Sequence, residues 1–291
     1  MSDSPEEEPT QETGTRLNKY LASCGIGSRR KCDEMIKKGS VIVNGKVCVD
    51  LSTSVNEDDF VKIGNSRVLP RETTTILLHK PKGLICTKDD ELKRETIYEL
   101  LPPNMRHLNH VGRLDQDSEG LLVMTNDGDL AQELSHPKLK IQKEYLVTVN
   151  QAFGNEVLDQ FLKGIWTGDA KMHAKAVKRL SPRRFLIILE TGLKRQIRMM
   201  CKAAHLNVTK LVRIRIGLVT GGGLEPGRFS ELDAHDIELL KRNPKQLEGN
   251  YRLAGSKSSA RAARKRPAGK KKPLGKVRRA KPNSSKKFKR T

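Results

Sequence analysis

The chain has 291 residues, enough for one or two domains, and carries 56 Lys/Arg against 34 Asp/Glu, a net charge of +22. No stretch approaches the roughly 18 consecutive apolar residues of a membrane span. The acidic N-terminus lacks the apolar segment of a secretory signal. The five cysteines form no Cys-x-x-Cys pair and no zinc-like group with histidine, which predicts reduced thiols in a cytoplasmic protein.

The positive charge is concentrated at the C-terminal end. Residues 252–291 contain 17 Lys/Arg and no acid, whereas residues 1–15 contain five acids and no base. Both segments have too few large apolar residues to form a core, so we predict a disordered acidic leader and a disordered basic tail. Residues 16–251 are themselves moderately basic. This distribution predicts a polyanionic partner, nucleic acid before membrane, with no membrane association.

Residues 16–64 have the pattern of two short helices followed by a hairpin. Ser28 suits the N-cap of the second helix, and Gly39 ends it. Residues 41–43 and 47–49 flank Asn44-Gly45, which predicts two strands joined by a tight turn. The apolar residues of the two helices follow an i, i+3, i+4 spacing: Leu17, Tyr20 and Leu21 in the first, and Cys32, Met35 and Ile36 in the second.

A linker over residues 65–72 is predicted to lead into a larger second domain over residues 73–251. There we expect strands at 76–79, 143–149 and 185–190, and helices at 129–135 and 195–205. These strands and helices do not alternate in a repeating βαβ order. The sequence therefore favours an α+β fold over a doubly wound sheet.

The first unit resembles an S4 RNA-binding domain over roughly residues 16–64. The likeness rests on Arg16–Leu21, on Gly25, on Ser28-Arg29-Arg30 and on the hairpin between Gly39 and Gly45. Basic residues lie away from the apolar faces of its helices. On charge alone a solvated helix face is an equally good interpretation.

Residues 112–128 carry the most distinctive chemistry, G-R-L-D-Q-D-S-E-G-L-L-V-M-T-N-D-G. Acids at alternate positions, 115, 117 and 119, precede an apolar run, which predicts a polar loop leading into a buried strand. Any of the three carboxylates is a candidate for catalysis, and an ordinary surface loop is the alternative. No phosphate-binding loop, zinc-binding helix motif or serine nucleophile elbow is present, so no cofactor or metal is predicted.

This segment resembles the catalytic motif of the RsuA family of pseudouridine synthases, whose catalytic aspartate falls on Asp115. The likeness spans about residues 16–240, and chain length and basic tail favour the family's large-subunit enzymes. Three further blocks agree in order: Lys80–Gly83, where His79 replaces the usual Asn; Lys143–Val147; and Glu190–Met200, which departs from the family pattern at Thr191 and Met199.

The resemblance implies an S4 domain followed by a catalytic domain with a mixed, mainly antiparallel sheet. It implies that Asp115 is the catalytic carboxylate, that Arg198 is its cationic partner and that Tyr145 packs on the target base. The substrate pocket is expected to include Arg113, Leu114 and Ile197. The residues expected to bind RNA are Arg16, Asn18, Lys19, Ser28, Arg29, Arg30, Lys80, Lys194 and Arg195.

The reaction so implied breaks the N1–C1′ bond of a uridine and forms C5–C1′, with no net oxidation or hydrolysis. The expected partner is structured ribosomal RNA with a flipped uridine, 23S before 16S, acted on by a monomer. A tRNA substrate, contact with ribosome assembly particles, and a non-catalytic S4-type ribosome-binding or assembly protein stay open as alternatives. The sequence does not choose between covalent attack and proton removal by the aspartate.

Overall fold

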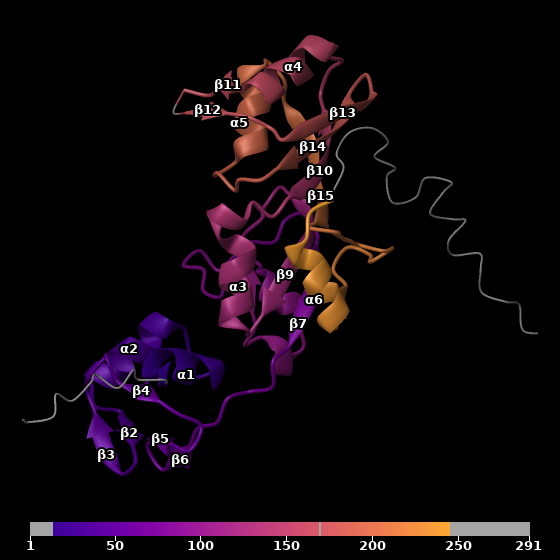
Figure 1. Ribbon diagram of the computed structural model, residues 1–291. Helices are drawn as coiled ribbons and strands as arrows, with labels where there is room; N and C mark the ends of the chain where they lie inside the picture. The colour runs from indigo at the N-terminus through magenta and orange to yellow at the C-terminus, as the bar shows by residue number, and fades with distance from the viewer. Residues whose placement is uncertain (1–13, 169, 245–291) are drawn as a thin grey trace, which may run out of the picture. The chain divides into compact units, whose positions relative to one another are not determined.

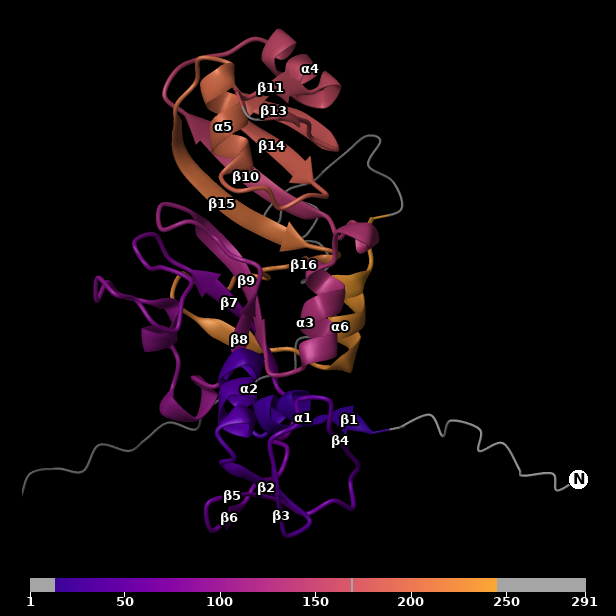
Figure 2. The same ribbon diagram turned by 90° about the vertical axis from the view of Figure 1, so that its left-hand side faces the viewer.

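The computed structural model describes residues 14–168 and 170–244 (Figures 1 and 2). The predicted basic tail and all but the last two residues of the predicted acidic leader lie outside the described residues. Within these ranges, no helix is both long and apolar enough to cross a bilayer.

The N-terminal unit has a core shared by two helices and a four-stranded sheet of order β3-β2-β5-β6. The Ser28 hydroxyl accepts a hydrogen bond from the Lys31 amide at 3.2 Å, which confirms the predicted N-cap of α2. The elements are β1 (Thr15–Arg16), α1 (Leu17–Ser23), α2 (Arg29–Lys37), β2 (Val41–Val43), β3 (Lys46–Cys48), β4 (Ser54–Val55), β5 (Val61–Ile63) and β6 (Ser66–Arg67).

Two element boundaries differ from those expected for this unit. Ser66 and Arg67 of the predicted linker pair with β5, and Val68 packs against the core, so the fold extends past residue 64. Thr15 of the predicted leader pairs with Val55. Pairing with a distant segment decides the first end, at Thr15, whereas the second end is set by a local hairpin between β5 and β6.

The second domain is built on a nine-stranded sheet with the main order β13-β14-β10-β15-β9-β7-β17, to which β8 and β16 add at β9 and β15. All of its pairs are antiparallel except β9 with β15, which agrees with the expected mixed, mainly antiparallel sheet. The strands are β7 (Thr75–Lys80), β8 (Asn109–Val111), β9 (Glu119–Thr125), β10 (Lys143–Val149), β13 (Ala176–Ser181), β14 (Arg184–Leu189), β15 (Val208–Ile216), β16 (Val219–Thr220) and β17 (Phe229–Glu231).

Helices cover the two halves of this sheet separately (Figures 1 and 2). The β10–β14 half buries apolar residues of α4 and α5, including Phe161 and Met200. The β7–β9 half buries residues of α3 and α6, including Leu130 and Leu240, on a separate core. These elements are α3 (Gly128–Ser135), α4 (Asn155–Lys163), α5 (Gln196–Ala203) and α6 (Ala234–Lys241), with short 3-10 turns at Ile97–Leu100, Pro103–Met105 and Pro137–Leu139 and a small pair of β11 (Ile165–Trp166) and β12 (Lys171–Met172).

The two halves of the sheet meet where β9 runs parallel to β15. Their register pairs Glu119 with Val212 and Gly120 with Arg213. Gly120 has φ +108, and a Cβ there would clash with the backbone of Arg213. Glycine is therefore required for this close approach. The 112–118 loop ends at this junction, so the fold presents the loop between the two halves.

Candidate active site

The 112–118 loop turns sharply between β8 and β9. Gly112 adopts φ +70 where the chain leaves β8, and the Ser118 amide donates to the Asp115 carbonyl at 3.0 Å to close a turn. The side chain of Asp115 keeps 33% of its surface exposed. The loop backbone is thus folded tightly while the carboxylate stays accessible.

Lys80 holds this loop from within the protein. It is fully buried at the end of β7, and its ammonium donates to the carbonyls of Ser118 at 2.9 Å, Pro81 at 3.0 Å and Gln116 at 3.4 Å. Burial lowers the pKa of Lys80. We expected Lys80 to bind RNA, and that expectation is wrong for direct contact because a fully buried ammonium cannot reach a phosphate.

Arg198 of α5 holds the same loop from a second element. Its Nη2 donates to the Asp117 carbonyl at 3.0 Å, and its Nη1 donates to the Val208 carbonyl at 3.3 Å. One guanidinium therefore links α5 to both the loop and the start of β15. Among the ion pairs of the described residues, the expected pair between Arg198 and Asp115 is absent.

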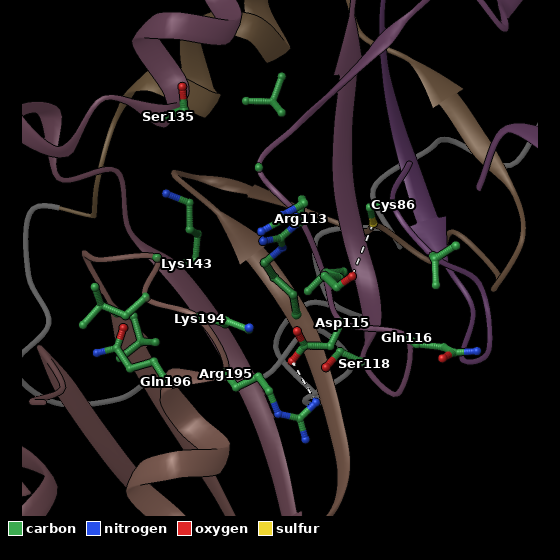
Figure 3. A pocket seen from close by; sticks show the side chains of 18 of the residues that line it. Cys86, Arg113, Asp115, Gln116, Ser118, Ser135, Lys143, Lys194, Arg195 and Gln196 are labelled. Carbon is green, nitrogen blue, oxygen red and sulfur yellow. Dashed lines mark hydrogen bonds and ion pairs between the residues drawn. The ribbon is translucent and has the colours of Figure 1, made fainter. Parts of the chain in front are cut away.

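Arg195 is the cation that the structure places beside Asp115. Its Nη1 lies 4.0 Å from Asp115 Oδ2, at the limit of an ion pair (Figure 3). Arg195 precedes α5 in a left-handed conformation, φ +52. This non-helical turn starts the helix one residue later than predicted and directs the arginine toward the loop. Sequence reasoning assigned Arg195 only to RNA binding.

A cavity of about 980 Å³ opens in front of Asp115. The expected pocket residues Arg113, Leu114 and Ile197 all line it, and Tyr145, Lys194 and Arg195 line it as well. Arg198, Lys80 and Asp117 are not among its lining residues. The volume is at the upper end of the roughly 300–1,000 Å³ of ligand sites, sufficient for a nucleotide with part of its backbone.

The lining residues that sequence reasoning did not assign to the site include two cations on the central strands, Lys143 on β10 and Arg213 on β15. Tyr145 pairs with Arg213 across the two strands, and Lys143 lies two residues before Tyr145. Since side chains two apart share a strand face, the strand periodicity already indicated that Lys143 accompanies Tyr145. Burial, reinforced by the charge of Arg213, lowers the pKa of Lys143 to about 8.

Six Lys/Arg and five Asp/Glu side chains line the cavity. Asp90 pairs with the lining Arg94 at 2.6 Å and Glu190 with Lys175 at 3.5 Å, so the remaining excess of positive charge is small. Within residues 14–168 and 170–244, no three His, Cys, Asp or Glu side chains are grouped as metal ligands. The cations that line the cavity are Arg94, Arg113, Lys143, Lys194, Arg195 and Arg213.

The residues expected to bind RNA in the N-terminal unit divide into two kinds. Asn18 is engaged internally, with its amide 2.7 Å from Asp33 Oδ1, and the Ser28 hydroxyl caps α2. Three arginines have exposed side chains: Arg16, Arg29 and Arg30; Lys19 is partly exposed. Arg29 also donates to the Asn18 side-chain oxygen at 3.2 Å, so an internal bond orients one of the exposed arginines.

Comparison with known families supports this organisation. Residues 74–203 match the family described as RNA pseudouridylate synthase. Residues 15–61 match the S4 domain. The first match covers the loop, Tyr145 and the start of α5, and the second covers the N-terminal unit.

Individual proteins give the same result over most of the chain. The dual-specificity RNA pseudouridine synthase RluF of Salmonella typhi is 37% identical over 267 residues, covering 88% of this chain and 89% of that protein. Ribosomal large subunit pseudouridine synthase B of Bacillus subtilis (strain 168) is 34% identical over 232 residues, covering 78% and 95%. A solved pseudouridylate synthase superposes with a TM-score of 0.57 at 26% identity, covering 78% of this chain and 99% of that one. With its S4 domain ahead of the catalytic domain, the chain belongs to the RsuA family of RNA pseudouridine synthases.

Proposed function

We propose that this pseudouridine synthase modifies a uridine of large-subunit ribosomal RNA and uses Asp115 as its catalytic carboxylate. One observation carries the choice of residue: of the four acids in the 112–128 motif, Asp115 lines the cavity, whereas Asp117, Glu119 and Asp127 do not. The RNA class is supported by the relative named for the ribosomal large subunit. A tRNA stays the second candidate substrate, and the name of the dual-specificity relative is a reason to test more than one RNA.

The chemistry requires an ionised carboxylate beside the ribose and the base. Breaking N1–C1′ frees the uracil, which must turn before C5 bonds to C1′ and loses its proton. In this series of steps Asp115 either attacks C1′ or removes a proton from the sugar, and both roles need its negative charge. The Arg195 guanidinium, 4.0 Å away, places a positive charge beside this carboxylate.

The surrounding side chains suit a single extruded base. Tyr145 is half-buried on the cavity wall and offers a ring for stacking, while Leu114 and Ile197 provide apolar surface. Extruding a uridine from its stack costs a few kcal/mol, on the order of 2–4. RNA contacts outside the cavity have to supply that energy. The exposed side chains of Arg29 and Arg30, on the S4 domain, are candidates for these contacts.

The test compares two adjacent acids of the loop. Wild-type protein, Asp115→Asn and Asp117→Asn are incubated with 23S, 16S and tRNA transcripts, and pseudouridine is mapped by carbodiimide labelling and primer extension. We expect modification of one 23S position by the wild type and by Asp117→Asn, and none by Asp115→Asn. Activity in Asp115→Asn would refute the assignment, and modification of only 16S or tRNA would refute the RNA class.

A further inference from the structure

Lys143 and Arg213 form a pair of cations on the inner wall of the cavity. Antiparallel pairing of β10 with β15 places Tyr145 opposite Arg213, and Lys143 follows two positions away on β10. All three residues line the cavity. In Figure 3 the side chain of Lys143 points toward the Ser135 side of the pocket, away from Asp115. The two cations thus lie beside the residue proposed to hold the base.

Neither cation has an acidic partner among the ion pairs of the described residues. Arg213 is 3% exposed, its Nε donates to the Leu121 carbonyl at 2.6 Å, and its Nη2 is buried without a hydrogen-bond partner. Lys143 donates to the Ile141 carbonyl at 3.1 Å. No carboxylate of the described residues pairs with either charge, so an anion bound at this wall would be stabilised by both.

The nearest acids are committed to other cations. Glu144, between Lys143 and Tyr145 on β10, binds Arg215 with Oε2 2.7 Å from Nε. The remaining charged or titratable groups that line the cavity on other elements are Cys86, Asp89, Asp90, Glu91, Arg94, Arg113, Asp115, His136, Glu190, Lys194 and Arg195. Of these, Asp115 pairs with Arg195 and Glu190 pairs with Lys175.

We propose that Lys143, supported by the charge of the more deeply buried Arg213, forms a subsite for a phosphate group that flanks the target uridine. The proposal rests on the proposed function only in taking a nucleotide as the ligand. Every nucleotide of an RNA chain is flanked by phosphates, so a uridine in the cavity brings an anion with it. A neutral uracil carbonyl would leave both positive charges uncompensated, whereas a phosphodiester removes one of them.

The subsite has a pH dependence with a definite sign. A phosphate next to Lys143 favours the ammonium and opposes the effect of burial and Arg213, which hold its pKa near 8 in the free protein. Phosphate binding is therefore strongest below pH 8 and weakens as the pH rises through that value. The phosphate, with a second pKa of about 6, is almost fully dianionic at both pH 7 and pH 9, and the uracil N3–H, which begins to ionise near pH 9, is common to uridine and its monophosphates. The ratio of their affinities therefore reports the protein.

The experiment measures binding of uridine, uridine 5′-monophosphate and uridine 3′-monophosphate to the full-length protein by calorimetry. Variants are Lys143→Met, Lys143→Arg and, as a matched loss of one charge, Lys163→Met at the exposed end of α4. We expect wild type, Lys143→Arg and Lys163→Met to bind one monophosphate at least about tenfold more tightly than uridine. In Lys143→Met the difference should fall below about twofold.

Equal wild-type affinity for all three compounds would overturn the proposal, as would an unchanged preference in Lys143→Met. Circular dichroism shows whether Lys143→Met is folded. If it is not, the affinities of the wild-type protein for the monophosphate and for uridine are compared at pH 7 and pH 9. A preference for the monophosphate that does not decline at pH 9 overturns the subsite. These readouts need no turnover. Activity in Asp115→Asn would therefore refute the catalytic assignment and leave the subsite standing.

Discussion

Two sets of cations surround the catalytic loop, and they differ in what they bind. Lys80 and Arg198 donate to backbone carbonyls of the loop at residues 116–118. The other set lines the open cavity and comprises Arg113, Lys143, Lys194, Arg195 and Arg213. Charge alone does not separate the two sets, because all of these residues belong to the same basic domain.

The difference teaches that a cation near an active site can hold the backbone, face the ligand, or do both, as Lys143 and Arg213 do with their own bonds to the Ile141 and Leu121 carbonyls. A cation that donates to carbonyls fixes the backbone, so its removal displaces Asp115 and leaves buried acceptors unsatisfied. A cation in the cavity meets the ligand directly, so its removal changes affinity and pH dependence more than it changes folding. The following predictions separate these roles, from the largest expected effect to the smallest.

We expect the largest effect from Lys80→Met, which removes one of the two cations that donate to the loop carbonyls. Methionine fills similar space but leaves the carbonyls of Pro81, Gln116 and Ser118 without their donor. We expect the free energy of unfolding to fall by about 3 kcal/mol, and kcat to fall at least about 100-fold because the loop relaxes. Urea denaturation and single-turnover kinetics measure these effects. Lys82→Met, two residues away and exposed, is the control, and equal behaviour of the two variants would contradict the role of Lys80.

Arg198→Lys tests whether geometry matters beyond charge. Lysine keeps the positive charge, but one ammonium cannot bridge the carbonyls of Asp117 and Val208 as the planar guanidinium does. We expect kcat to drop by about 10²-fold while the Kd for RNA stays within about twofold. Lys202→Arg, on the exposed side of the same helix, should behave as wild type. Wild-type turnover in Arg198→Lys would show that charge alone suffices.

Arg195→Ala tests the cation beside Asp115. The 4.0 Å separation and the half-exposed guanidinium indicate a weakly coupled pair in the free enzyme. We expect kcat to fall by about tenfold and Arg195→Lys to retain most of the activity, because charge rather than fork geometry is needed here. Rates measured at saturating RNA decide this. Equal losses in both variants would indicate a geometric role like that of Arg198.

Arg29→Ala with Arg30→Ala tests the N-terminal domain, where the smallest effect on turnover is expected. Both side chains are exposed at the start of α2, so their loss should raise KM by about fivefold at low salt and leave kcat unchanged. Lys37→Ala with Lys38→Ala removes the same charge from the other end of the helix. A similar rise in KM for both pairs would show that net charge, rather than this surface, binds the RNA.

Local sequence patterns were sufficient for the elements that pack by periodicity. The strand Lys143–Val149 and the helices around Leu17–Ser23 and Arg29–Lys37 occur where the apolar spacing predicts them, and the N-cap at Ser28 is present. Each of these features depends on neighbours within a few residues in the chain. The family resemblance of the 112–128 motif, rather than local chemistry, singled out Asp115, Arg113 and Leu114, which all line the cavity.

Tertiary structure alone decided what each cation does. Lys80 reaches Ser118, and Arg198 reaches Asp117, across separations of 38 and 81 residues. Arg195 turns toward Asp115 because its own backbone is left-handed, and Arg213 meets Tyr145 because two strands 60 and more residues apart are paired. A basic side chain is compatible with solvent, RNA or a buried carbonyl. Only the three-dimensional placement of acceptors and acids selects among them, because hydrogen bonding and burial act over a few ångströms in space, independent of separation along the chain.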